Sequence, residues 1–261
     1  MAARRFEIPT PALVALLVVA GCAGPMDLVS DPGADATADP GACRDRGTPG
    51  ATAACLQPTR PPQYYVEHGL KYFDTLDSSA DPASVPAYWE HVARWEWPPW
   101  LKLTGWGRDH VVATAKLLKQ ADPVTVPSRD CRAFAVQPFC RCVVSFAYPE
   151  GPCPIYEEFT FDDQGRMTFV EAWSDLPGLL PGDPVADRWA ERPGFPRLST
   201  RVPGLGAASP VIDLGSAWMQ AAEARDPDVA DFAAHARDPW ATWAAELKAA
   251  GDTLYPRGCG W

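Results

Sequence analysis

The hydrophobic residues that follow Gln63 recur at intervals of three or four, a spacing that is typical of an amphipathic helix. A first helix is predicted over residues 63–76, because the polar run Asp77-Ser78-Ser79 then ends the pattern. The same spacing predicts a second helix over 84–95, with a proline tolerated in its first turn, and a third over 109–120. Their apolar faces consist of Val66, Leu70, Phe73 and Leu76; of Val85, Tyr88, Trp89, Val92 and Trp95; and of Val111, Ala115 and Leu118.

Strand-like runs follow the third helix. They cover residues 131–136, 140–148, 155–162 and 166–174, and a shorter strand is predicted over 100–105. The last two long strands are joined by Asp162-Asp163-Gln164-Gly165, whose first and fourth residues are typical of a type I turn closed by a glycine bulge. This turn places Asp162 opposite Arg166 and thereby predicts the register of the hairpin.

The predicted register brings two glutamates together. Glu157 and Glu171 lie directly opposite each other on the apolar face of the hairpin, beside Trp173. Two carboxylates on a buried face repel, so either one keeps its proton near neutral pH or a cation lies between them. Such a pair is suited to general acid and base catalysis. The alternatives are salt bridges to Arg132 or Arg141, or a register one residue off, in which both glutamates face water.

The start of the chain has another pattern, in which two arginines precede an apolar run over 12–20. This run is too short to span a bilayer and ends in small residues, which indicates a secretion signal. Val19-Ala20-Gly21-Cys22 resembles the bacterial lipobox, and the resemblance implies removal of residues 1–21 and a diacylglyceryl group on Cys22. The alternative is an ordinary signal peptide. We expect a protein anchored to the membrane by lipid at the cell envelope, at the outer membrane or the cell surface.

Residues 22–61 are rich in Ala, Pro, Asp, Gly and Thr, which predicts a flexible tether. Of the eight cysteines, seven remain besides Cys22, and in an exported chain disulfides are the default expectation. The candidates are a bridge between Cys43 and Cys55, although Cys259 could reach either of them, and at least one bridge among four strand cysteines. These four are Cys131, Cys140, Cys142 and Cys153.

Composition narrows the class of protein further. The formal net charge of −10 argues against nucleic acid as a partner. The only closely spaced cysteines, Cys140-Arg141-Cys142, lack metal-ligand spacing, so we expect no metal site. No G-x-S-x-G, P-loop or dinucleotide motif occurs, so a serine hydrolase, an NTPase and a Rossmann enzyme are unsupported and no cofactor is expected.

Between residues 62 and 175, the order of elements resembles the NTF2-like superfamily, in particular its SnoaL-like branch. The likeness rests on Leu103-Thr104-Gly105-Trp106-Gly107-Arg108-Asp109, on the run over 156–162 and on Gly165-Arg166-Met167-Thr168. It implies an α+β cone, in which a curved antiparallel sheet wraps around three N-terminal helices and leaves an apolar pocket at its mouth. The family includes isomerases, cyclases, dehydratases, epoxide hydrolases and domains without activity, with no common position for the acid and base residues.

Residues 176–261 form an extension that a minimal domain of this type lacks. It is rich in proline and glycine up to about residue 215 and helical beyond, since Asp226-Pro227 and Asp238-Pro239 each place an N-cap before a first-turn proline. We expect the helices to pack outside the sheet or across the pocket mouth as a lid. Their predicted inward faces are Val229, Phe232, Ala233 and Ala236, followed by Trp240, Trp243, Ala244 and Leu247.

Two functions follow from these patterns. The first is a non-catalytic envelope lipoprotein that binds an apolar small molecule or a partner protein. The second is a SnoaL-like enzyme that acts on a small apolar substrate through Glu157, Glu171 or Asp109. Asp109-His110 opens the third helix, and we interpret the aspartate as a cap rather than as one member of a dyad. The depth of the pocket, and whether Trp and Phe side chains fill it, should discriminate the two functions.

Overall fold

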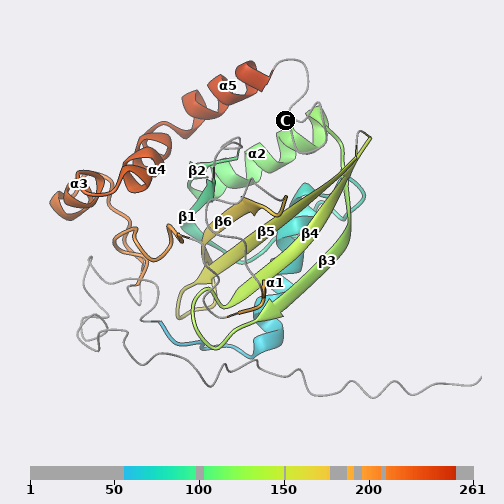
Figure 1. Cartoon of the computed structure of the whole chain (residues 1–261), viewed down its shortest axis with the longest axis horizontal. Helices are drawn as coiled ribbons and strands as arrows, with labels where there is room; N and C mark the ends of the chain where they lie inside the picture. The colour runs from blue at the N-terminus through green and yellow to red at the C-terminus, as the bar shows by residue number, and fades with distance from the viewer. Residues whose placement is uncertain are drawn as a thin grey trace, which may run out of the picture.

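A curved six-stranded sheet forms the centre of this α+β protein (Figure 1). The structure is a computed structural model, and it describes residues 56–97, 103–149, 151–176, 187–190, 196–206 and 210–250. The strand order is β2-β1-β6-β5-β4-β3, and neighbours are antiparallel except for the parallel pair of β1 and β6. The strands are β1 (Tyr88–Glu96), β2 (Gly105–Trp106), β3 (Thr125–Ala133), β4 (Cys140–Tyr148), β5 (Gly151–Phe161) and β6 (Met167–Ser174).

The described helices fall into two groups. Two of them come before β3 in the chain and pack on one side of the sheet, which we call the inner face; the other three follow β6 (Figure 1). The first group is α1 (Pro62–Leu76) and α2 (Arg108–Ala121), and the second is α3 (Ala217–Glu223), α4 (Pro227–Arg237) and α5 (Pro239–Ala250). The curved sheet and its inner helices give the cone that the sequence predicts.

The predicted helix over 84–95 is wrong, because this segment forms β1. The cone therefore holds two N-terminal helices rather than three. In β1, Val92 faces the inner core while Ala93 and Trp95 face the outer one. A strand that is buried on both faces carries apolar residues at successive positions, and their spacing imitates that of a helix.

Each face of the sheet has its own hydrophobic core. The inner core joins α1 and α2 to the sheet, and the outer core joins the sheet to the C-terminal extension. We call the side that the extension covers the outer face. Large buried side chains of the inner core include Tyr65, Tyr72, Phe73, Phe159 and Phe161, and those of the outer core include Trp95, Tyr156, Phe169, Trp173 and Phe232.

The predicted hairpin register holds at the turn but not beyond it. The amide of Asp162 donates to the carbonyl of Arg166, and Gly165 has the positive φ of 79° that the turn requires. A bulge between Thr160 and Phe161 then shifts the pairing by one residue. As a result Glu171 lies opposite Glu158, and Glu157 lies opposite Ala172 on the other face.

The extension packs on the outer face through α4. Asp226 accepts hydrogen bonds from the amides of Asp228 and Val229, so it caps α4 as predicted. Phe232 contacts both Trp95 and Phe169 edge-on or tilted. The four predicted inward residues of α4, Val229, Phe232, Ala233 and Ala236, are all buried. In α5, Asp238 also caps as predicted, but Trp240 is 47% exposed rather than inward.

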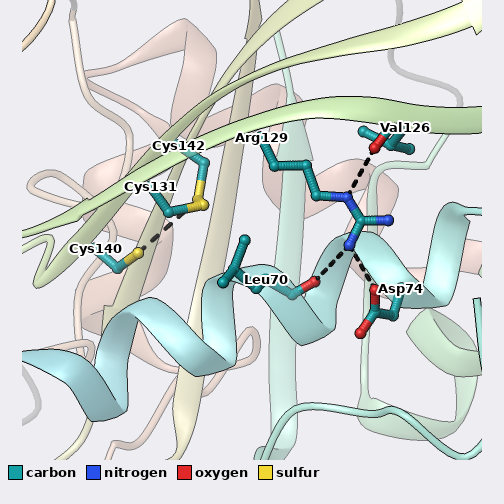
Figure 2. Close-up of a disulfide and its surroundings, with 7 residues drawn as sticks. All are labelled: Leu70, Asp74, Val126, Arg129, Cys131, Cys140 and Cys142. Carbon is teal, nitrogen blue, oxygen red and sulfur yellow. Dashed lines mark hydrogen bonds and ion pairs between the residues drawn. A yellow bond between two sulfur atoms is a disulfide. The ribbon is translucent and has the colours of Figure 1, made fainter. Parts of the chain in front are cut away.

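A disulfide joins β3 to β4 between Cys131 and Cys142, one of the bridges expected among the strand cysteines (Figure 2). Cys153 is also disulfide-bonded. Among the cysteines that the structure describes, Cys140 is free, and its Sγ lies 4.0 Å from that of Cys142. Gly69 of α1 makes room for these sulfur atoms, since a Cβ there would lie 2.8 Å from the Cys140 Sγ.

Close to this disulfide, hydrogen bonds of Arg129 connect β3 to α1 (Figure 2). Its guanidinium donates to the carbonyl of Leu70 and to the carboxylate of Asp74, and its Nε donates to the carbonyl of Val126. A further bond reaches Asp77 at 2.6 Å, directly after α1. This network fixes the first helix on the edge of the sheet.

The predicted signal sequence over residues 1–21, the lipidation site Cys22 and the candidate pair Cys43 and Cys55 lie outside the described residues. Within the described ranges, none of the helices has the length and hydropathy needed to cross a membrane.

Candidate functional site

Glu157 is the most unusual ionisable group of the inner face. Its side chain on β5 is fully buried, and neither carboxyl oxygen has a hydrogen-bond partner. The nearest cation is Arg94 of β1, whose Nη2 lies 3.6 Å from Oε1. Burial raises the pKa of Glu157 to about 8, in spite of the nearby guanidinium. Glu157 is therefore mostly protonated at neutral pH.

A second carboxylate explains why Arg94 leaves Glu157 neutral. Glu96, two residues along β1, accepts a bond from Arg94 at 2.7 Å and another from the amide of Leu103 at 2.8 Å. The amide of Glu96 in turn donates to the hydroxyl of Thr104. The charge of the arginine is thus balanced by the closer carboxylate. A neutral carboxyl next to an ion pair has the chemistry of a general acid.

The space beside this group is small. The cavity within the cone has a volume of about 20 Å³, which is room for about one water molecule. Ligand pockets typically measure about 300–1,000 Å³. Among the described residues, the cavity that borders Arg94 and Glu96 is therefore too small for a substrate. The cavity is lined by Leu76, Arg94, Glu96, Leu103, Leu118, Phe146, Tyr148, Cys153 and Ile155.

The paired glutamates lie on the outer face, and they are Glu158 and Glu171. The carboxylate of Glu158 binds Arg141 of β4 at 2.8 Å and Arg197 of the extension at 2.5 and 2.8 Å. These two arginines hold the pKa of Glu158 below its usual range, against the effect of burial. The predicted pairing of Glu157 with Glu171 is wrong, because Glu171 lies opposite Glu158. Arg141, one of the two arginines considered as a salt-bridge partner, binds Glu158.

Glu171 is held by N–H groups instead of by a cation. It accepts from the indole of Trp97 at 2.9 Å and from the amides of Leu198 and Ser199 at 2.5 and 3.1 Å. Burial raises the pKa of Glu171 to about 7, although the three donors oppose this shift. Glu158 and Glu171 together fix residues 197–199 on the sheet, so the pair is a structural clamp. Trp173 is fully buried on the same face, against the ring of Tyr156.

At the start of α2, the predicted roles of Asp109 and His110 change. The N-cap is Gly107, with a φ of 92° and no side-chain bond, and Asp109 is 98% exposed, so it does not cap the helix. His110 is only 4% exposed, and a Cβ on Gly105 would lie 2.3 Å from its ring. Neither ring nitrogen has a hydrogen-bond partner. Burial lowers the pKa of His110 to about 4, so the ring is neutral.

A pocket of about 310 Å³ opens at this end of α2. The indole of Trp240 from α5 meets the His110 ring at a centroid distance of 4.6 Å, nearly perpendicular to it. Elsewhere in the lining, Trp106 stacks on His91 with a centroid distance of 5.6 Å. We call this site the α2–α5 pocket. It is lined by Glu90, His91, Trp106, Gly107, Arg108, Asp109, His110, Pro239 and Trp240.

A second open site lies on the far side of α2. This groove has a volume of about 360 Å³ and lies between α2, the end of α1 and the loop that precedes β1. Its apolar floor includes Val85 and Val112, which are 36% and 37% exposed. We call it the α2 groove. Its lining residues are Thr75, Pro82, Val85, Val112, Ala115, Lys116, Lys119 and Gln120.

Sequence reasoning missed several residues of these sites. Arg94 lies within the segment predicted as a helix and Glu96 directly after it, whereas alternation along β1 places both on the inner face. Arg197 lies in a proline-rich stretch without periodicity, and nothing local marks it as a partner of Glu158. The described ranges contain no group of three or more His, Cys, Asp or Glu side chains that could hold a metal ion.

Comparison with known proteins finds a similarity to solved structures only. No family model and no curated protein matches the sequence. Among solved structures, the chain is similar to a SnoaL-like family protein from Agrobacterium tumefaciens strain C58 that is described as a candidate isomerase. The TM-score is 0.34 at 15% sequence identity, and the match covers 44% of this chain and 99% of the other.

Proposed function

We propose that this chain is a lipid-anchored cell-envelope protein whose α+β domain is a non-catalytic binding module for an apolar small molecule or a partner protein. Cys22 at the end of the apolar leader supports the anchor. The tether-like composition of residues 22–61 would keep the domain near the membrane surface. The domain then acts by what its surface binds.

One observation carries the binding role: the described cavity within the cone is small, whereas the α2 groove is open. The interior offers about 20 Å³ and the groove about 360 Å³, of which only the second suits a small ligand. The groove is lined by the exposed side chains of Val85 and Val112 and by Lys116 and Lys119. Lys119 also donates to the carbonyl of Asp74 at 3.0 Å. An apolar ligand with an acidic group would match this lining.

A titration with anilinonaphthalene sulfonate, an apolar probe with an acidic group, tests the assignment. Val112→Glu places a charge in the groove, and we expect it to weaken binding by at least about tenfold. Leu117→Glu is the matched control, because Leu117 lies on the same helix, is 39% exposed and does not line the groove. Equal affinities of both variants and wild type would refute the assignment.

The SnoaL-like enzyme remains the second candidate, favoured by Glu157 alone. A protonated carboxyl without a hydrogen-bond partner, 3.6 Å from an arginine, resembles the general acids of buried active sites. This function requires a conformation in which the cone opens. If probe binding were lost in Ile155→Phe, which fills the cavity, and kept in Val112→Glu, the ligand would lie inside the cone and the enzyme would be favoured.

A further inference from the structure

We propose that the α2–α5 pocket is a binding site for a neutral saccharide. It is separate from both the cone interior and the α2 groove, so it goes beyond the proposed function. Three features of the pocket support this assignment: an unsatisfied buried side chain, the balance of charges and the aromatic walls. Each points to a ligand that carries hydroxyl groups on an apolar ring.

The unsatisfied side chain is His110. Its ring is buried at the pocket wall, and neither nitrogen has a protein partner. Buried polar atoms without partners are costly, and such a group calls for a bound molecule. A neutral imidazole offers one donor and one acceptor. A hydroxyl group both donates and accepts, so a sugar hydroxyl can pair with a ring nitrogen. Both nitrogens are covered by neighbouring protein atoms in this structure, so such a bond requires those neighbours to move aside.

The charges around the pocket nearly cancel. Glu90 and Asp109 contribute two carboxylates, while Arg108 contributes a guanidinium. The N-terminus of α2 adds roughly half a positive charge, and its Gly107 cap leaves the amides of the first turn without a side-chain acceptor. The carboxylates would repel an anion, and the arginine together with the positive end of the helix would repel a cation. A neutral ligand with many donors and acceptors uses all of these groups.

The walls supply the apolar contact. Trp240 is 47% exposed although its ring contacts that of His110, and Trp106 stacks on His91 in the same lining. Indole rings have large flat apolar faces and commonly serve as contact surfaces. The C–H face of a sugar ring can pack on such a face while its hydroxyls reach the polar rim. A volume of about 310 Å³ lies at the lower end of ligand sites, which suits one or two rings.

The test is a calorimetric titration of the full chain with cellotriose and with its N-acetylated analogue chitotriose. We expect saturable binding of at least one trisaccharide, weakened at least about tenfold by Trp240→Ala. Trp243→Ala is the matched control, because Trp243 neighbours Trp240 on α5 but does not line the pocket. His110→Phe keeps an aromatic ring and removes both nitrogens, so it should weaken binding as well.

The opposite outcomes are equally clear. The site is refuted if neither trisaccharide binds to wild type, or if Trp240→Ala binds as tightly as Trp243→Ala. Saturable binding of inorganic phosphate or phosphocholine in place of the sugars, lost in Trp240→Ala, would also overturn the proposal, because it would assign a charged ligand to the pocket. Val112→Glu should leave saccharide affinity unchanged, which separates this test from that of the α2 groove.

Discussion

Glu157→Gln should stabilise the protein in a strongly pH-dependent way. The carboxyl has a pKa of about 8 in the folded chain against an ordinary value of 4.5. Below pH 4.5 it is protonated in both the folded and the unfolded state, so it has no effect on the pH dependence. Between these two values the unfolded chain releases the proton and the folded chain keeps it. The wild type therefore loses stability as the pH rises towards 8.

The magnitude follows from the difference between the two pKa values. Each pKa unit corresponds to about 1.36 kcal/mol, so at pH 7 the wild type has lost on the order of 3 kcal/mol relative to acid pH. Glutamine has nearly the shape of the protonated acid and does not titrate. It should match wild type near pH 4 and exceed it by about 3 kcal/mol at pH 7, which for a chain of this size is a rise in Tm of roughly 6–12 °C.

Urea unfolding at a series of pH values between 4 and 9 measures this difference. Glu67→Gln is a suitable control, because Glu67 is exposed on α1 and its replacement should change stability by less than about 0.5 kcal/mol. A stability difference that stays flat from pH 5 to pH 8 would refute the reasoning. A Glu157→Gln variant less stable than wild type at pH 7 would show that Glu157 is ionised and paired with Arg94.

Three further predictions address other parts of the chain. Mature wild type should lack residues 1–21 by mass spectrometry and partition into detergent, whereas Cys22→Ala should stay soluble or unprocessed; an intact leader on wild type would contradict lipidation. Glu158→Gln leaves two buried arginines without their carboxylate, so thermal melts should show a loss of about 3–5 kcal/mol, and a change below about 1 kcal/mol would argue against the clamp. Non-reducing peptide mapping should recover Cys131 linked to Cys142, with Cys140 unreactive to alkylation until the chain unfolds, because burial raises its pKa well above the usual range. Rapid alkylation of Cys140 in the native protein would disprove this.

The interior of the cone and the outer clamp show two ways to bury a carboxylate. Glu158 keeps its charge because two arginines compensate for its desolvation. Glu157 lacks a dedicated cation, since Arg94 is taken by Glu96, and it gives up its charge instead. Neighbouring residues of one strand thus differ in protonation because they face opposite sides of the sheet. This difference in protonation between Glu157 and Glu158 can be used to test a functional role of either carboxyl group.

The sequence by itself determined the elements whose signals are local. Periodicity predicted α1 and α2, and the polar residues after Leu76 ended the first helix where the structure ends it. The strands β4, β5 and β6, the turn at Asp162 and the caps at Asp226 and Asp238 were also predicted, because each depends on residues only a few positions apart. The strand predicted over 131–136 overlaps β3 by only three residues, since β3 runs over Thr125–Ala133. The cysteines of the strands were expected to pair because the predicted export signal favours disulfides, and one such pair, Cys131 with Cys142, is formed.

Only the tertiary structure decided the rest. The segment over 84–95 became a strand because β6 pairs with it and both of its faces are buried, which no local pattern can reveal. A one-residue bulge in the pairing of β5 with β6, after Thr160, moved Glu171 to the face opposite that of Glu157 and placed it across from Glu158, since side chains alternate along a strand. Arg197 and Trp240 acquire partners from remote parts of the chain. The periodicity of the sequence indicates which residues are buried. The contacts that determine the protonation of a side chain, its pKa and the shape of a pocket come from segments far apart in sequence.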